Sequence, residues 1–364
     1  MNKIRVLDGL RGYAALMVIL SHMPQITSSE VCGTFYFLIS YFNLGYLGVD
    51  LFFVLSGFLI TRILVAEKKK KQFSFKVFYL KRAIRIFPIY YLTLILSGLL
   101  FTWKGFDYLA VYVGNYYFVF EQGLHPLAHT WSLSVEEHYY LFWPIILCTF
   151  KLKHLKQYVL PIVLIITLSA ILITYTLFDE AIASRLIYKG TQFRILSLSM
   201  GSLLVFHEKY LLSLNRKKAT MLLFFLGAIG FVMVALVQEK MDAMIIPVPI
   251  IRLFMFSICS VLFFVFVLLQ EKRGNSIDDL FNNRLIGYIG KISYGLYLYH
   301  YPIFFGFGIT RNQLNDRALP LTEFIVPLSL VFIVAMASYT FIEKPLMHYK
   351  AKWVLRMKAE ARRI

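Results

Sequence analysis

The chain has 364 residues, of which 59% are hydrophobic and only 16% are charged, and its mean hydropathy is +0.67. A soluble protein has roughly a quarter of its residues charged, so this composition excludes a soluble globular protein and indicates repeated membrane crossing. The formal net charge of +18 requires no nucleic-acid partner, because anionic lipid attracts basic loops to the inner membrane surface.

Apolar segments long enough to cross a bilayer as a helix predict an all-α, polytopic membrane protein with about ten transmembrane helices in a single domain, residues 1–364. The predicted spans are 8–24, 45–65, 86–104, 134–150, 159–178, 193–207, 219–238, 250–269, 287–308 and 322–342. The stretch 107–122 is apolar but short and interrupted, so we expect an interfacial or re-entrant segment. If it crossed the membrane, the count would be eleven and the C-terminus would lie on the other side.

The distribution of basic residues favours ten spans. With the N-terminus inside, the cytoplasmic segments hold 29 lysines and arginines and the outer segments hold 8. This asymmetry follows the positive-inside rule and predicts that both termini, including the basic tail 344–364, are cytoplasmic. The first span resembles a signal peptide, but no small-residue cleavage site follows and Arg11 interrupts its apolar core, so we expect an uncleaved helix. Cys32, Cys148 and Cys259 indicate no disulfide framework.

The first predicted span carries two polar groups, Arg11 and His22, eleven positions apart. Eleven helical steps make about three full turns, so both residues lie on one face, about 16 Å apart along the axis. An arginine in a bilayer costs several kcal/mol unless it faces a protein interior or a wet cavity. Histidine is well suited to proton transfer or nucleophilic chemistry near neutral pH. This face therefore indicates the wall of a reaction channel.

Residues 66–87 contain apolar side chains at alternating steps of four and three, with basic residues off that stripe. The pattern predicts a basic amphipathic helix lying on the cytoplasmic membrane surface and turning into the membrane at Pro88. For Lys68 to Lys71 we favour lipid anchoring and topology determination over phosphate binding. Arg82 and Arg85 are the better candidates for binding an anionic cofactor, because the guanidinium fork matches phosphate.

The second predicted span contains Gly48 and Gly57, small residues that let neighbouring helices approach closely. Asp50 and Ser56 are its polar residues. Asp50 is either an interfacial carboxylate or a residue that supports substrate binding. For Ser56 we favour a hydrogen bond between packed helices.

The fourth predicted span begins with a run of polar and aromatic residues. Ser134 and Glu137 have the spacing of a capping box, so Glu137 is expected to close the start of a helix. Glu136 has no such local explanation, and its carboxylate is predicted to orient the histidine or to activate an acceptor hydroxyl. Trp131 fits a substrate site or an aromatic belt at the membrane surface equally well.

His300, in the ninth predicted span, is the main rival to His22. It precedes Pro302 by two positions, so it either satisfies backbone carbonyls that the proline leaves free or supports the substrate site.

Six motifs carry a family resemblance: LDGLRGYAAL with SHM, GYLGVDLFFVLSGFLIT, KRAIRIFPIYY, TWSLSVEEHYYLFWP, GKISYGLYLYHYPIF and FIEKP, spread over residues 7–345. They resemble the acyltransferase-3 family of bacterial integral-membrane acyltransferases, which O-acylate cell-surface sugars and other extracytoplasmic acceptors. The resemblance implies that Arg11 and His22 are essential, and that Glu136 and the Arg82–Arg85–Pro88 element are functional. His138 departs from the family, which often has glutamine there. Many members carry an extra soluble hydrolase-like domain after the last span, and we expect none here.

The resemblance implies acetyl-CoA or another acyl-CoA as cytoplasmic donor, a sugar or polysaccharide acceptor outside, residence in the bacterial inner membrane, and no metal. His22 and Glu136 would be catalytic, Arg11, Arg82 and Arg85 would bind the cofactor, and Asp50, Trp131 and His300 would bind or support substrate. His22 either accepts the acyl group as an acyl-imidazole or acts as general base. The alternative function is a transporter, although no pair of correspondingly broken helices indicates inverted repeats. A scaffold for polysaccharide assembly is a further alternative, but it has no need of Arg11 and His22 on one apolar face.

Overall fold

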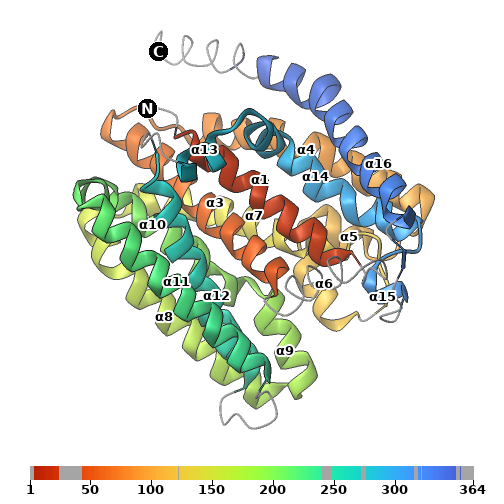
Figure 1. The fold of residues 1–364 in the computed structure, drawn as a ribbon, viewed down its shortest axis with the longest axis horizontal. Helices are drawn as coiled ribbons and strands as arrows, with labels where there is room; N and C mark the ends of the chain where they lie inside the picture. The colour runs from red at the N-terminus through yellow and green to blue at the C-terminus, as the bar shows by residue number, and fades with distance from the viewer. Residues whose placement is uncertain are drawn as a thin grey trace.

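The computed structural model describes residues 4–23, 43–121, 123–239, 247–271, 276–314, 319–320, 322–349 and 353. These residues form helices and no β-strand, as the sequence predicts (Figure 1). The helices are α1 (Val6–His22), α3 (Leu44–Lys69), α4 (Phe75–Leu100), α5 (Phe106–Ala110), α6 (Gly114–Phe120), η1 (Ala128–Thr130), α7 (Trp131–Thr149), α8 (Leu152–Leu177), α9 (Glu180–Lys189), α10 (Thr191–Ser213), α11 (Arg216–Glu239), α12 (Val248–Leu268), α13 (Ser276–Asn282), α14 (Arg284–Gly306), α15 (Arg311–Leu314), α16 (Thr322–Ser338) and the π-helix η3 (Tyr339–Glu343).

Each of the ten predicted spans falls on one of the long helices. Among the described residues, five helices are long and apolar enough to cross a membrane: α3, α4, α8, α12 and α16 with its continuation to Tyr349. The membrane character is therefore supported, whereas ten crossings and the orientation of the termini stay predictions. The stretch 107–122 contains only α5 and α6, of 5 and 7 residues, each too short to span a bilayer. Beyond Tyr349 the basic tail is described only at Trp353, and Cys32 also lies outside the described residues.

A separate helix over 66–87 does not form, whereas the cytoplasmic position of this segment stays a prediction. α3 continues to Lys69, and α4 is one uninterrupted helix from Phe75 to Leu100, with Pro88 inside it. A proline inside a membrane helix is tolerated because neighbouring helices and local adjustments satisfy the carbonyl it leaves free. Lys76, Lys81, Arg82 and Arg85 therefore lie in the N-terminal part of α4, whereas Lys68 and Lys69 lie in the last turn of α3.

Lys68, for which we expected lipid anchoring, contacts protein carbonyls instead. Its Nζ donates hydrogen bonds to the carbonyls of Leu147, Cys148 and Phe150, at 2.6, 3.2 and 2.6 Å. These carbonyls lie at the C-terminal end of α7, where helix geometry leaves carbonyls without a partner. Lys68 thus caps a neighbouring helix.

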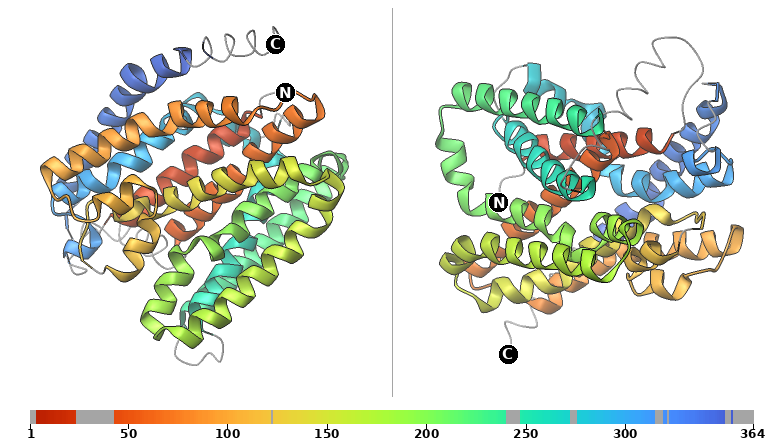
Figure 2. Two further views of the ribbon diagram at one scale, coloured as in Figure 1. Left: turned by 180° about the vertical axis from the view of Figure 1, so that it is seen from behind. Right: turned by 90° about the horizontal axis from the view of Figure 1, so that it is seen from below.

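α1 lies between α3 and α14 at the centre of the bundle (Figure 1). The two glycines predicted to permit close helix packing do so. A Cβ on Gly48 would stand 2.9 Å from the carbonyl oxygen of Ala14 in α1, and one on Gly57 would collide with the backbone of Leu198 in α10. α3 is therefore held tightly between α1 and α10. Figure 2 shows α8 and α11 on the side of the bundle away from α16.

Candidate active site

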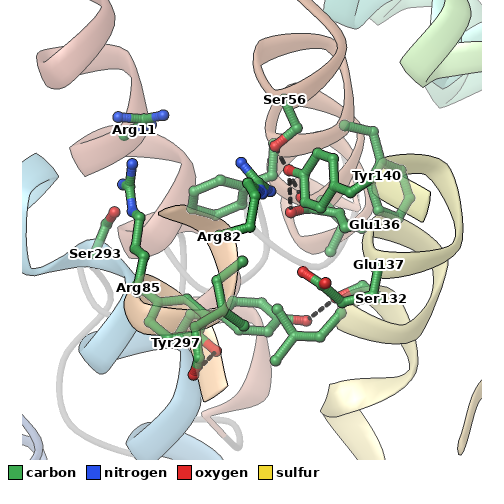
Figure 3. Close-up of a pocket in the computed structure, with 16 residues that line it drawn as sticks. Arg11, Ser56, Arg82, Arg85, Ser132, Glu136, Glu137, Tyr140, Ser293 and Tyr297 are labelled. Carbon is green, nitrogen blue, oxygen red and sulfur yellow. Dashed lines mark hydrogen bonds between the residues drawn. The ribbon is translucent and has the colours of Figure 1, made fainter. Parts of the chain in front are cut away.

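Three arginines from two helices surround a cavity of about 100 Å³ between α1, α3, α4, α7 and α14 (Figure 3). A neighbouring cavity of about 280 Å³ shares five polar lining residues with the first cavity and extends to Asp8 and Arg62. We call the two together the arginine cavity. Its shared polar residues are Arg11, Ser56, Arg82, Arg85 and Tyr140.

One side of the arginine cavity is a compact network around Glu136. The Glu136 carboxylate accepts hydrogen bonds from Ser56 at 3.1 Å and from Tyr140 at 2.8 Å. The Arg82 guanidinium lies over the Tyr140 ring, 3.2 Å from its centroid, a cation–π contact. The bond from Ser56 joins α3 to α7, so its predicted role in helix packing is confirmed.

Arg11 and Arg85 lie on the side of the cavity opposite Glu136 and Glu137 (Figure 3). The nearest carboxylate oxygen to Arg11 belongs to Asp8, at the long distance of 3.9 Å. Arg85 is the most exposed of the three arginines that line the cavity. A polyanion entering here would meet several guanidinium groups, each able to bind phosphate through two hydrogen bonds.

The capping box predicted for Glu137 is wrong. α7 begins at Trp131, continuing the 3₁₀ turn η1, and its cap residue Thr130 makes no side-chain capping bond. Ser134 is consequently inside the helix, where its buried hydroxyl has no hydrogen-bond partner among the residues that the structure describes. Glu137 lines the arginine cavity instead.

A second cavity, of about 340 Å³, contains the end of α1. We call it the histidine cavity. Its lining combines imidazole, phenol, indole and ammonium groups from α1, α3, η1, α7, α9 and α14, chiefly His22, Tyr46, His129, Trp131, Tyr188, Lys189, Tyr297 and Tyr301.

Three histidines from distant parts of the chain meet at this cavity. Nδ1 of His22 lies 3.0 Å from the carbonyl oxygen of Val18 and 3.1 Å from Nε2 of His300. The ring of His129 lies 5.0 Å from that of His300, centroid to centroid. His300 is fully buried and His129 nearly so. Histidine clusters of this kind can take up, hold or pass a proton.

His129, rather than His300, serves the carbonyl that Pro302 leaves free. Pro302 has no N–H, so the carbonyl four residues earlier, on Leu298, loses its helical partner. Nε2 of His129 donates to that oxygen at 3.1 Å. Burial lowers the pKa of His129 to about 3, because a low-dielectric surrounding disfavours the imidazolium. Its Nδ1 is buried and has no hydrogen-bond partner among the described residues.

Tyr297 separates the two cavities. Together with Val49 it lines both of them. Its hydroxyl donates to the carbonyl of His129 at 2.8 Å, so it accepts from Ser132, whose Oγ lies 2.6 Å away. The side chain is thereby held across the boundary between the arginine and histidine cavities.

The aromatic wall of the histidine cavity is supported from behind by a buried ion pair. The Arg194 guanidinium lies over the rings of Tyr188 and Trp131, 4.8 and 5.7 Å from their centroids. It also donates to Asp50 at 3.1 Å, and Ser197 donates to the other Asp50 oxygen at 2.5 Å. Asp50 is completely buried, so the interpretation of an interfacial carboxylate is wrong, and it lines neither cavity.

The predicted site residues thus fall into two groups. The arginine cavity brings together Arg11, Arg82, Arg85 and Glu136, and the histidine cavity brings together His22 and Trp131, with His300 behind. Glu136 does not orient His22, because its oxygens face Ser56 and Tyr140.

Sequence reasoning missed His129, Tyr297 and Arg194. His129 lies in the motif HTWSLSVE, which also contains Glu136, and Tyr297 lies in YGLYLYH, which also contains His300. Their position in these motifs was the only local signal for them. Arg194 lies at the start of the predicted span 193–207, and an arginine within a span is itself a signal of a functional or paired residue.

Comparison with known proteins gives a consistent set of matches. The acyltransferase domain family matches residues 4–340. The peptidoglycan O-acetyltransferase OatA of Listeria monocytogenes serovar 1/2a is 29% identical over 369 aligned positions, covering 93% of this chain and 55% of that protein. The O-acetyltransferase OatA of Staphylococcus aureus (strain NCTC 8325 / PS 47) is 28% identical, covering 93% and 56%. The chain therefore spans a little over half the length of these relatives. No solved structure matches it.

Proposed function

The chain belongs to the acyltransferase domain family, and we propose that it is a membrane O-acyltransferase. In this proposal an acetyl or other acyl group passes from cytoplasmic acyl-CoA to a hydroxyl of an extracytoplasmic sugar, in a surface polysaccharide or its lipid-linked precursor. The observation that carries it is one helix, α1, with an arginine in one cavity and a histidine in the next. The two cavities would serve the two ends of the donor.

The arginine cavity is the proposed site for the phosphates of CoA. Arg11, Arg82 and Arg85 supply forked donors that suit phosphate oxygens better than lysine does. The turn between α3 and α4 contains Lys70 and Lys71, and basic residues of this kind are expected on the cytoplasmic face, where acyl-CoA is found. The Glu136 network holds Tyr140 under Arg82, so Glu136 would shape the donor site rather than act at the thioester.

The thioester would then reach His22 past Tyr297. Arg11 and His22 lie about 16 Å apart along α1, a gap that the long flexible pantetheine arm of CoA suits. At His22 two routes remain open. Either the imidazole takes up the acyl group and passes it on, or it removes the proton from the acceptor hydroxyl while that oxygen attacks the thioester.

A sugar acceptor is supported by the chemistry of the histidine cavity. Trp131, Tyr188 and Tyr46 present flat aromatic surfaces, with polar edges for hydroxyl groups. Two matched relatives are named O-acetyltransferases, and one is named for peptidoglycan. We therefore place the acceptor hydroxyl in the histidine cavity, beside His22.

The test uses the purified full chain in lipid nanodiscs, supplied with labelled acetyl-CoA and a soluble sugar acceptor. We expect acetyl transfer to the sugar by the native chain and its near-complete loss in His22→Ala. His207→Ala is the matched control, because His207 also contacts the carbonyl four residues before it but lines neither cavity. Full activity in a folded His22→Ala variant would refute the mechanism. Sugar uptake into sealed proteoliposomes of the same chain without consumption of acetyl-CoA would instead establish a transporter.

A further inference from the structure

His300 is completely buried behind His22, and its Nε2 lies 3.1 Å from Nδ1 of His22. We propose that His300 is a positioning residue: it accepts the Nδ1 hydrogen of His22 and so leaves the His22 Nε2 lone pair for the reaction. This inference rests on the proposed function, because it assigns a role to His300 in chemistry at His22.

The hydrogen-bond partners of His300 fix which of its nitrogens carries the hydrogen. Nδ1 of His300 lies 2.6 Å from the carbonyl oxygen of Tyr297 and 3.2 Å from that of Leu296. A carbonyl only accepts, so Nδ1 is the donor nitrogen. In the neutral ring Nε2 then holds a lone pair, and toward His22 it can only accept.

The same reasoning assigns the hydrogen of His22. Its Nδ1 faces one carbonyl, that of Val18, and one acceptor nitrogen, that of His300. Neither of these groups can donate a hydrogen to Nδ1, so Nδ1 itself carries the hydrogen and the lone pair is on Nε2. The described residues give this Nε2 no hydrogen-bond partner, and the ring lines the histidine cavity.

Val18 alone is a poor partner for that hydrogen. Its carbonyl also accepts from the hydroxyl of Ser21 at 2.7 Å and stands four residues before His22, where it accepts the helical N–H. A carbonyl oxygen has two lone pairs, so these donors already satisfy it. His300 supplies the acceptor that His22 would otherwise lack. The ring of Tyr301 also contacts that of His22, with centroids 5.1 Å apart, and His129 lines the same cavity.

The hydrogen bond from His22 to His300 would stabilise a positively charged His22 ring in either chemical route. If Nε2 attacks the thioester, a C–N bond forms, the C–S bond breaks and the thiolate leaves with its electron pair, so the acylated ring is positive. If Nε2 removes the hydroxyl proton, that proton makes the ring positive until it passes to the departing thiolate. In both cases the positive charge raises the acidity of Nδ1–H, and a hydrogen bond to a charged group is stronger than a neutral one.

Two substitutions separate this role from a merely structural one. His300→Gln places an amide near the position of Nε2, where its oxygen can accept from His22. His300→Asn places its amide near the position of Nδ1, where it can serve the carbonyls of Leu296 and Tyr297 but cannot reach His22. A positioning role predicts that Gln preserves activity and Asn does not, and a structural role predicts the reverse.

We expect His300→Asn to lower kcat by about 10- to 100-fold, the effect of losing a hydrogen bond to a charged group, with little change in KM for acetyl-CoA. The pH at which the activity of His300→Asn declines should also differ from that of the native chain. His300→Gln should retain activity within about tenfold. In the His22→Ala background His300→Asn should cause no further loss, because residues that act as a unit are not additive.

Native activity in His300→Asn, or a greater loss in His300→Gln than in His300→Asn, would overturn the proposal. If both variants lose activity, the pH–rate profile of the residual activity decides. A profile identical to that of the native chain overturns the proposal, and a shifted profile supports it. Thermal unfolding of each variant checks the fold. Absence of acetyl transfer by the native chain, or full transfer by His22→Ala, would be a failure of the proposed function and not of the His300 assignment.

Discussion

The guanidinium of Arg194 lies 3.1 Å from the carboxylate of Asp50, with the two side chains only 3% and 1% exposed. Removing two charges from water is expensive, and their attraction offsets that cost only when hydrogen bonds satisfy the remaining atoms. Here Ser197 donates to the second carboxylate oxygen and the Tyr188 carbonyl accepts from Nε of Arg194. The pair therefore connects α3 and α10 and fixes the aromatic wall of the histidine cavity.

Breaking this pair from one side should destabilise the protein strongly. Asp50→Leu leaves the Arg194 charge buried without its partner, and we expect a loss of about 3–5 kcal/mol in the free energy of unfolding. The double variant Asp50→Leu/Arg194→Met removes both charges and should recover most of that loss. Thermal or denaturant unfolding in one detergent measures both. A single variant as stable as the double variant would contradict the ion-pair assignment.

The arginine cavity predicts a donor-specific effect. Arg85→Ala should raise KM for acetyl-CoA by about tenfold or more, because one phosphate-binding guanidinium is lost, and should leave kinetics with acetyl-pantetheine, which has no phosphate, unchanged. Lys81→Ala is the matched control, since Lys81 is also on α4 but pairs with Glu67 of α3 and does not line the cavity. Equal effects on both donors would mean that Arg85 does not bind phosphate.

The helices were predictable because a bilayer imposes a minimum apolar length, which hydropathy detects directly. The error over 66–87 arose because Pro88 was taken as a helix boundary, whereas the surrounding helices tolerate it inside α4. The capping box was a local pattern overridden by an earlier start at Trp131. Local patterns therefore located the helices better than their ends.

In the candidate site too, features within one helix were predictable and contacts between helices were not. Arg11 and His22 could be placed on one face from helical spacing alone. The contact of His22 with His300 joins residues 278 positions apart, and it depends on α14 packing against α1. Nothing in the spacing of either helix specifies that pairing, nor that Glu136 faces Ser56 rather than His22.

The Tyr297 ring should limit the access of water to the acyl donor. Tyr297→Ala removes the side chain that lines both cavities, so acetyl-CoA hydrolysis without sugar should rise relative to transfer. Tyr297→Phe keeps the ring and loses only the bonds to Ser132 and to the His129 carbonyl. It should therefore keep the native ratio of hydrolysis to transfer. An unchanged ratio in Tyr297→Ala would show that the ring is not the barrier.

Lys68 should stabilise the fold through the end of α7. Lys68→Met removes the donor to three terminal carbonyls, and we expect a loss of about 1–2 kcal/mol in the free energy of unfolding. Lys69→Met is the control, because Lys69 is exposed and its removal should change stability by less than about 0.5 kcal/mol. Equal losses in the two variants would favour general charge effects over capping.

The low pKa of His129 makes a prediction about pH. Its pKa of about 3 lies below that of an ordinary histidine, so the ring becomes charged only in strong acid and stays neutral in any assay between about pH 5 and 9. The decline of activity toward acid must then come from another group. His129→Gln removes the imidazole but keeps an amide that can donate to the carbonyl of Leu298. It should leave the pH at which activity declines unchanged. A shift of that pH on replacing His129 would mean that His129 itself titrates during catalysis, which its burial argues against.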